Sequence, residues 1–417
     1  MHYERSHVDL LVERLREPVE RIIAIFGPRQ CGKTTIQRQA LRKVPYVSHE
    51  FAVDAPTSES AKPRSSTAAD ARLVTAQRDT EWLVRTWREC SEEAARSGAK
   101  SVMVLDEIQK IPQWSETVKG LWDADRASGC PMHVVVLGSA PMRMQAGLAE
   151  SLAGRFELIR ATHWSFTEMR DAFGYDCDEF VFFGGYPGAA DFRSDFGRWR
   201  AYVSDALIEP HLEQDLLQMV RVDKPALLRQ LFELGCLYSG QELSYKKMRG
   251  QLEDAGHEST LARYLGFLSD AGLVTGLFKH SKTPLTRRSS SPKLNVLNTA
   301  LMSAVAGDAF EDTVARANRN HWGHVVESAV GAHLVNTASP ATNVRYWRDG
   351  NSEVDFVLQR GPHLVGVEVK AGGGRPRRSS LEDFERRFSA SPSIVVGENG
   401  VPLQDFLSEP ADHWLGS

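Results

Sequence analysis

The sequence predicts an α/β fold that begins with a parallel sheet covered by helices on both faces. Three short runs without polar alternation, 21–26, 101–105 and 133–137, are separated by helix-like segments. Uninterrupted apolar runs of this length are typical of strands buried on both faces of a parallel sheet. From residue 164 to 273 the pattern is helical, and strands of period two return near residue 344. We therefore expect a helical middle region and a second, C-terminal α/β region.

Length and composition set the outer limits. The chain has 417 residues, enough for two or three domains, and 50 Lys and Arg against 54 Asp and Glu leave a net charge of -4. No global positive field attracts it to nucleic acid, so any such contact must be local. The five cysteines include no C-x-x-C pair, which indicates a reducing compartment. The charged N-terminus and the lack of a long apolar run favour a cytoplasmic protein without membrane contact.

A phosphate-binding motif follows the first apolar run directly. Residues 27–34 fit the pattern G-x-x-x-x-G-K-[ST] and lead into a helical stretch. Glycines allow backbone N–H groups to surround a phosphate at a helix N-terminus, the lysine reaches the β- and γ-phosphates, and the Thr34 hydroxyl is expected to bind Mg²⁺. We expect ATP and Mg²⁺ as cofactors. The expected nucleotide-binding residues are Gly27, Pro28, Arg29, Gln30, Cys31, Gly32, Lys33, Thr34 and Thr35.

Acidic and polar residues at the ends of the next two apolar runs complete this prediction. Asp106 is expected to hold Mg²⁺ and Glu107 to polarise the attacking water, although such a pair can also merely cap the next helix. Ser139 ends the third run and could sense the γ-phosphate or be a simple turn residue. Arg155 could stabilise transition-state charge as an arginine finger, or be an ordinary surface arginine. The expected catalytic residues here are Lys33, Glu107, Ser139 and Arg155.

A hairpin near the C-terminus brings carboxylates together. Residues 352–370 alternate on either side of a Gly-Pro turn, and centring that turn between residues 361 and 362 places Asp355 opposite Glu368, with Lys370 on the same face. Two facing carboxylates repel unless a cation lies between them, and Mg²⁺ with a nearby lysine is typical of nuclease chemistry. Glu327, on an expected helix over 322–334, could complete this metal site or face solvent. The hairpin could also be a half-exposed strand pair, or a decayed, metal-free site.

A stretch from residue 279 to 293 carries five basic residues and no acid. They are Lys279, Lys282, Arg287, Arg288 and Lys293. Such a stretch can contact phosphates or form a solvated loop.

Together these residues resemble prokaryotic P-loop ATPases of the AAA superfamily whose C-terminal domain of unknown function is related to PD-(D/E)XK nucleases. The resemblance spans nearly the whole chain. Its segments are the loop 27–35, Leu105–Gln109, Gly138–Ala140, Leu152–Arg155, Gly184–Pro187, Pro292–Leu294, Glu353–Phe356 and Val367–Lys370. Asn298-Thr299-Ala300 departs from the Asp-Thr-Gly usual in the family, and Cys31 replaces a small aliphatic residue.

This resemblance implies a P-loop AAA-type ATPase domain over 1–162, a helical linker over 163–235, a winged-helix-like region over 236–300 and a PD-(D/E)XK nuclease-like domain over 301–417. Segments 243–252 and 259–271 look like two short helices, of which the second would be a recognition helix offering Arg263. The basic stretch would then be the wing. A small helical bundle with a basic loop is the alternative.

Two functional hypotheses follow. In the first, ATP hydrolysis is coupled to a Mg²⁺-dependent nuclease that acts on DNA through the winged-helix-like region and the C-terminal domain. In the second, the chain is an ATP-controlled switch whose inactive nuclease-like domain binds a protein partner. The complete set of hairpin residues favours the first, and the net charge favours the second. AAA relatives often assemble into rings, so a homo-oligomer is a further expectation, and the sequence does not distinguish action of Arg155 in cis from action in trans.

Overall fold

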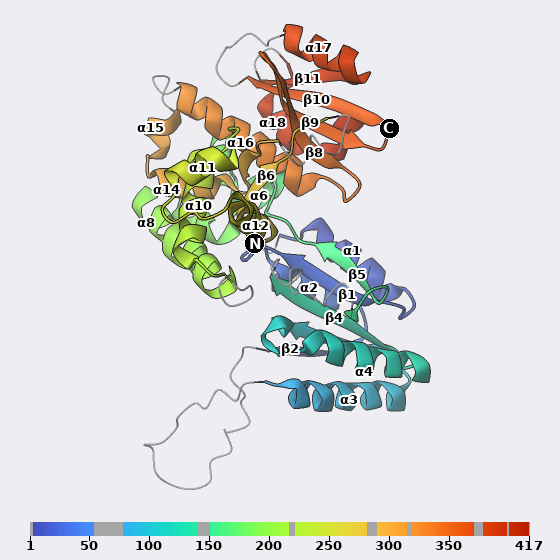
Figure 1. Cartoon of the computed structure of the whole chain (residues 1–417). Helices are drawn as coiled ribbons and strands as arrows, with labels where there is room; N and C mark the ends of the chain where they lie inside the picture. The colour runs from blue at the N-terminus through green and yellow to red at the C-terminus, as the bar shows by residue number, and fades with distance from the viewer. Residues whose placement is uncertain are drawn as a thin grey trace. The chain divides into compact units, whose positions relative to one another are not determined.

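Figure 1 shows the computed structural model of the chain, which describes residues 3–53, 78–139, 151–216, 222–281, 290–314, 319–370, 378–397 and 400–416. The chain divides into two compact units. The smaller comprises Glu4–Gly27 and Gly32–Ala161, and the larger comprises the N-terminus to Tyr3, Pro28–Cys31 and the chain from Thr162 onward. Because the larger unit spans all three regions expected beyond residue 162, the boundaries between those regions stay predictions.

The smaller unit is built on a five-stranded parallel sheet in the order β2-β3-β4-β1-β5. The three expected strands are confirmed as the central ones, buried on both faces as their uninterrupted apolar runs require. Their neighbours β2 and β5 form the edges. The strands are β1 (Ile22–Gly27), β2 (Val47–Ala52), β3 (Ser101–Asp106), β4 (Met132–Ser139) and β5 (Phe156–Arg160).

Helices cover both faces of this sheet. On one face of the sheet, α3 packs against α4 (Figure 1). Every second strand residue, such as Ile22 and Met103, is buried in the core on that face. The strand residues between them, such as Ile23, are buried on the opposite face, where α1 and α2 pack together. This is the α/β arrangement of P-loop NTPases. The helices are α1 (Ser6–Arg16), α2 (Lys33–Leu41), α3 (Thr80–Ser97), the short 3-10 turn η2 (Ile108–Lys110) and α4 (Trp114–Ser128).

The larger unit begins with helices, as the sequence pattern predicts. Two of them start with reciprocal capping boxes, formed by Ser165 with Glu168 and by Asp176 with Glu179. The elements are α6 (Phe166–Phe173), α7 (Cys177–Phe183), η4 (Pro187–Phe192), α8 (Phe196–Ala201), the π-helical segments η5 (Tyr202–Ile208) and η6 (His211–Leu216), α10 (Pro225–Leu237), α11 (Tyr245–Gln251) and α12 (Glu258–Asp270). A two-stranded antiparallel sheet of β6 (Val274–Leu277) and β7 (Lys293–Val296) follows.

The C-terminal part contains a four-stranded mixed sheet in the order β11-β10-β9-β8. Pairs such as His363 with Arg360 and Val367 with Phe356 confirm the hairpin register expected from the Gly-Pro turn. After α17, β11 returns parallel to β10. The elements are α14 (Thr299–Ala306), α15 (Phe310–Val314), α16 (Arg319–Thr337), β8 (Asn343–Asp349), β9 (Ser352–Arg360), β10 (His363–Lys370), α17 (Arg378–Phe388), β11 (Ser391–Gly397), α18 (Leu403–Ser408) and η8 (Ala411–Leu415).

Within the ranges given above, no helix is both long enough and apolar enough to cross a membrane.

Candidate functional site

The expected phosphate-binding loop connects β1 to α2 at the carboxyl edge of the parallel sheet. Its backbone turns sharply because Gln30 and Gly32 adopt left-handed conformations, with φ of 61° and 91°. Lys33 opens the helix, and its Nζ donates to the Gly27 carbonyl at 2.9 Å. This contact holds a largely buried ammonium over the loop at the N-terminus of a helix, where phosphate groups bind.

Two residues of the predicted magnesium site lie together. The Thr34 hydroxyl donates to Asp106 Oδ2 at 2.8 Å, joining the first turn of α2 to the end of β3. A hydroxyl and a carboxylate are the oxygen donors that Mg²⁺ prefers beside nucleotide phosphates. This donor set fits the Mg²⁺ and the nucleotide that the sequence predicts. Thr35 follows in the same helix.

Glu107 follows Asp106 in a left-handed conformation, with φ of 57°, which is costly for a residue with a Cβ atom. Its Oε2 accepts a hydrogen bond of 2.6 Å from Gln109 Nε2, and Gln109 is buried. The backbone conformation and this hydrogen bond together fix the direction of the carboxylate at the carboxyl end of β3. Sequence reasoning did not assign Gln109 a role, although its position two residues after the expected base is visible in the Asp-Glu-Ile-Gln segment.

Ser139 ends β4 directly beside Gly27 of β1. Its backbone therefore lies at the same carboxyl edge of the sheet as the loop, where ligands of open α/β sheets gather. The side chain of Ser139 lies outside the described part of the molecule, so its role as a γ-phosphate sensor stays a prediction.

Arg155 lies at the opposite end of the sheet. It precedes β5, and its carbonyl accepts from the backbone N–H of Ile22 at the start of β1. Its guanidinium makes a bidentate ion pair with Asp123, at 2.7 and 2.9 Å. The length of a strand separates it from the phosphate-binding loop, so the structure does not bring Arg155 to this site in cis. Action in trans stays a prediction.

The apex of the loop, Pro28–Cys31, belongs by its contacts to the larger unit. Within that unit, the Arg29 N–H donates to Nε2 of the buried His211 at 3.0 Å. Trp164 Nε1 donates to the carbonyl of Cys31 at 3.1 Å. The loop backbone is thus held on one side by residues of the helical region.

The C-terminal hairpin carries the second cluster of residues that the sequence singles out. Asp355 Oδ2 accepts from the backbone N–H of Val369 at 2.8 Å, and Glu368 Oε1 pairs with Lys370 Nζ at 2.5 Å. Glu368 is 2% exposed, and its Oε2 has no hydrogen-bond partner among the described residues. Burial, with the neighbouring charge of Asp355, raises the pKa of Glu368 to about 7. An orphaned, buried carboxylate oxygen beside a second carboxylate fits the metal ligand set that the sequence predicts.

Glu327 reaches the same cluster from α16, but it pairs with a residue that the sequence places elsewhere. Lys293 Nζ lies 2.5 Å from Glu327 Oε1 and 4.0 Å from Asp355 Oδ1. Lys293 was expected in an exposed basic wing, whereas it is 5% exposed in β7. It therefore cannot contact nucleic acid as part of a wing, because β7 turns it into the interior. Three other residues of that stretch, Lys282, Arg287 and Arg288, lie outside the described residues.

Among the side chains that the structure describes, no three His, Cys, Asp or Glu residues converge as a preformed metal cage. The acidic groups of the hairpin cluster are instead interleaved with Lys293 and Lys370. An open pocket of about 300 Å³ lies over Lys293, Glu327 and Asp355. The metal-ligand role of Glu327, Asp355 and Glu368, and the catalytic role of Lys370, stay predictions.

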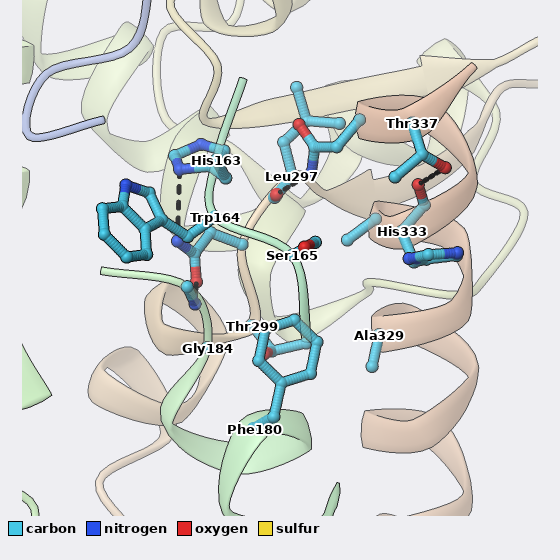
Figure 2. A pocket seen from close by; sticks show the side chains of 14 residues that line it. His163, Trp164, Ser165, Phe180, Gly184, Leu297, Thr299, Ala329, His333 and Thr337 are labelled. Atoms are coloured by element: carbon cyan, nitrogen blue, oxygen red, sulfur yellow. Dashed lines mark hydrogen bonds between the residues drawn. The ribbon is translucent and has the colours of Figure 1, made fainter. Parts of the chain in front are cut away.

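A separate, small cavity explains two other segments of the expected family pattern. It has a volume of about 20 Å³, room for one water, and His163, Gly184 and His333 are among its lining residues (Figure 2). The dashed line from His163 in Figure 2 marks the hydrogen bond to its Nδ1 from Asn298 Nδ2, at 3.2 Å. Asn298 Oδ1 accepts from the N–H of Gly185. Asn298 and the double glycine therefore pack against each other, which is a structural role.

Comparison with known proteins divides the chain into three matched regions. Residues 19–170 match a family model described as an AAA domain. Residues 174–312 match a domain of unknown function, DUF8612, and residues 322–407 match another, DUF4143. Two mycobacterial relatives, the uncharacterized protein Rv2008c of Mycobacterium tuberculosis and the uncharacterized protein Mb2031c of Mycobacterium bovis, are each 29% identical over 413 residues, covering 96% of this chain and 83% of theirs.

Two of the solved structures that resemble the chain each share 14% sequence identity with it. The Walker-type ATPase PABY2304 of Pyrococcus abyssi has a TM-score of 0.48 and covers 73% of this chain and 96% of its own. The ORC1 protein of Aeropyrum pernix in complex with DNA has a TM-score of 0.31, covering 74% and 94%. Taken with its sheet and its phosphate-binding loop, the match over residues 19–170 makes this part of the chain an AAA-type P-loop domain.

Proposed function

We propose that the chain hydrolyses ATP with Mg²⁺ at its phosphate-binding loop. The observation that carries this proposal is the 2.8 Å contact between Thr34 and Asp106, with Glu107 held beside it. Bound Mg²⁺ would neutralise charge on the β- and γ-phosphates. Thr34 and Asp106 would hold the cation, Lys33 would contact the phosphates, and Glu107 would take the proton of the attacking water.

The experiment compares ATP binding with ATP turnover. Lys33→Ala should abolish nucleotide binding, and Glu107→Gln should bind ATP without hydrolysing it, because the amide keeps the side-chain shape but cannot accept the water proton. Glu81→Gln, on the exposed side of α3, is the matched control and should turn over ATP at the wild-type rate. Turnover retained in Glu107→Gln would remove Glu107 as the base.

We propose a second activity, Mg²⁺-dependent cleavage of DNA by a PD-(D/E)XK-like C-terminal domain. Support comes from the orphaned Glu368 Oε2, from Asp355 on the adjoining strand, and from Lys370 within 2.5 Å of Glu368. Asp355 and Glu368 would hold Mg²⁺, and Lys370 would position the nucleophile or neutralise the transition state. Bound Mg²⁺ would supply an activated water and stabilise charge on the phosphodiester.

The element order α11, α12, β6, β7 supports a winged-helix-like region with α12 as its recognition helix. Arg263 on α12 is half exposed and forms a surface ion pair with Asp223 at 3.1 Å. Exposed pairs of this kind contribute little, so Arg263 can exchange its partner for a DNA phosphate. These features support contact with the DNA backbone rather than recognition of bases.

The test is cleavage of labelled single-stranded DNA, duplex DNA and RNA with Mg²⁺ or Mn²⁺, with and without ATP. Metal-dependent cuts should occur on DNA and vanish in Lys370→Ala, whereas Lys110→Ala, outside this domain, should cut normally. No cleavage with ATPase activity intact would favour the ATP-controlled switch, in which this domain binds a protein partner.

A further inference from the structure

Lys293 is enclosed by oxygen atoms in the way that a bound cation would be. Its Nζ lies 2.5 Å from Glu327 Oε1 and donates to the backbone carbonyl of Asp355 at 3.0 Å. The Asp355 carboxylate follows at 4.0 Å, and the ring of Phe356 lies below at 4.6 Å. A carboxylate, a carbonyl and a second carboxylate are the oxygen ligands that Mg²⁺ or Mn²⁺ would take in this place.

Lys293 and Glu327 form a buried ion pair, with side chains that are 7% and 18% exposed. Removing one member of a buried pair leaves the other charge uncompensated, which is costly. The ammonium belongs to the covalent chain and stays at the site, unlike a metal ion, which exchanges with solvent.

The neighbouring half of the cluster differs. Glu368 Oε2 has no hydrogen-bond partner in the part of the chain that the structure describes, although the residue is buried, and Glu368 Oε1 pairs with Lys370. The pocket of about 300 Å³ that opens over Lys293, Glu327 and Asp355 gives solvent ions access to the Lys293 side. Ions from solvent can therefore reach Glu327 and Asp355, but Lys293 already supplies the positive charge that these carboxylates would take from a metal ion.

We propose that Lys293 is the resident cation of this site and occupies the position where Glu327 and Asp355 would otherwise bind a divalent metal. Glu327 is thereby withdrawn from metal binding, and within this cluster a divalent ion would have Asp355 and Glu368 as its carboxylate ligands. The inference rests on the proposed function, which makes these carboxylates metal ligands. It assigns Lys293 a role in cation selectivity instead of phosphate contact.

The experiment counts Mn²⁺ bound to the full-length, nucleotide-free chain by isothermal titration calorimetry. Lys293→Met keeps an unbranched side chain over Phe356 and removes the charge, so Glu327 becomes available. We expect Lys293→Met to bind about one Mn²⁺ more than the wild type. Lys293→Arg keeps the charge and should bind as the wild type does. Mn²⁺ at the phosphate-binding loop is common to all variants and cancels in the difference.

The double variant Lys293→Met, Glu327→Gln identifies the ligand. It removes both charges of the pair, so it should fold, and the additional Mn²⁺ should disappear. A Lys293→Met chain that folds only when Mn²⁺ is added would support the proposal equally, because the metal then replaces the missing ammonium. An unchanged Mn²⁺ count, an extra ion that survives in the double variant, or a variant that Mn²⁺ does not fold would overturn it.

This readout is independent of DNA cleavage. A chain that cuts no DNA but gains Mn²⁺ in Lys293→Met confirms the resident lysine and refutes only the nuclease. A chain that cuts DNA but shows no gain refutes only the role of Lys293.

Discussion

The Thr34 hydroxyl donates to Asp106 Oδ2 at 2.8 Å. This contact joins the phosphate-binding loop, which follows β1, to the end of β3, and β4 lies between these two strands in the sheet. The two residues are 72 positions apart in the chain. Parallel strands bring them together because their carboxyl ends share one edge. The contact holds the hydroxyl and the carboxylate at a separation that a single cation can bridge.

Asp106→Asn tests this relationship. The amide keeps the hydrogen bond to Thr34 but binds Mg²⁺ more weakly, because it lacks the negative charge. The Mg²⁺ concentration that gives half-maximal ATPase activity should rise at least about tenfold, the equivalent of about 1.4 kcal/mol. A Mg²⁺ titration of steady-state ATPase measures this. Asp123→Asn, at the other end of the sheet, should leave the Mg²⁺ requirement unchanged, and an equal rise in both variants would contradict the assignment.

Gln109 positions the expected base. Because its amide donates to Glu107 Oε2 at 2.6 Å, Gln109→Leu should lower kcat about tenfold while KM for ATP changes less than about twofold. Steady-state ATPase kinetics measure both parameters. A rise in KM equal to the fall in kcat would assign Gln109 a purely structural role.

The elements that could be predicted from the sequence are those whose residues are buried. The central strands and the 352–370 hairpin were predictable because their residues are buried on one or both faces, which imposes a clear pattern. The edge strand β2 reads Val-Ser-His-Glu-Phe-Ala, largely exposed, so no such pattern marks it. Lys293 was misassigned for a related reason. The residues at 287–291, which precede it, are basic or polar. Its partner Asp355, 62 residues away, is brought to it only by tertiary packing.

Arg155→Ala distinguishes action in cis from action in trans. Arg155 pairs with Asp123 at the amino end of the sheet, so the ATPase rate per chain should be unchanged at high dilution. Turnover measured from nanomolar to micromolar chain concentration tests this. A rate that rises with concentration in the wild type but not in Arg155→Ala would establish an arginine finger supplied by another copy. A loss that is independent of concentration would contradict the placement in the structure.

Two glycines provide a matched test of the packing around Asn298. Gly184 and Gly174 both end short helices with positive φ, 68° and 70°, but ψ is -165° at Gly184 and 29° at Gly174. A Cβ atom at Gly174 would meet no described atom within 4 Å, whereas at Gly184 it would clash with Asn298 Oδ1.

Gly174→Ala should therefore cost about 1 kcal/mol of unfolding free energy, the strain of the left-handed conformation alone. Gly184→Ala should cost about 2 kcal/mol more, because its backbone conformation is nearly restricted to glycine and because the backbone must also move away from Asn298. Urea unfolding followed by circular dichroism measures both losses. Equal losses would mean that neither the backbone conformation of Gly184 nor Asn298 resists the added Cβ atom.

His333 should make the larger unit sensitive to acid. It is buried in α16, and its ring donates to the carbonyl of Glu409 at 2.8 Å. Burial lowers the pKa of His333 to about 4, well below the value of about 6.5 for the unfolded chain. Between these two pH values the unfolded state binds a proton on His333 that the folded state does not bind. The contribution of His333 to the unfolding free energy is therefore complete above pH 6.5 and declines as the pH falls toward 4.

Between pH 6.5 and pH 4, protonation of His333 in the unfolded state should lower the unfolding free energy by about 3 kcal/mol. His333→Gln keeps a donor for the Glu409 carbonyl but cannot take a proton, so its unfolding free energy should fall less than that of the wild type by about this amount. His413→Gln, at an exposed position, should follow the wild type. Urea unfolding at pH 7, 6, 5 and 4.5 compares the three proteins. Parallel curves for the wild type and His333→Gln would show that the folded chain accepts a charged His333. Burial of the ring beside α18 opposes this, because no carboxylate contacts the ring in the described structure.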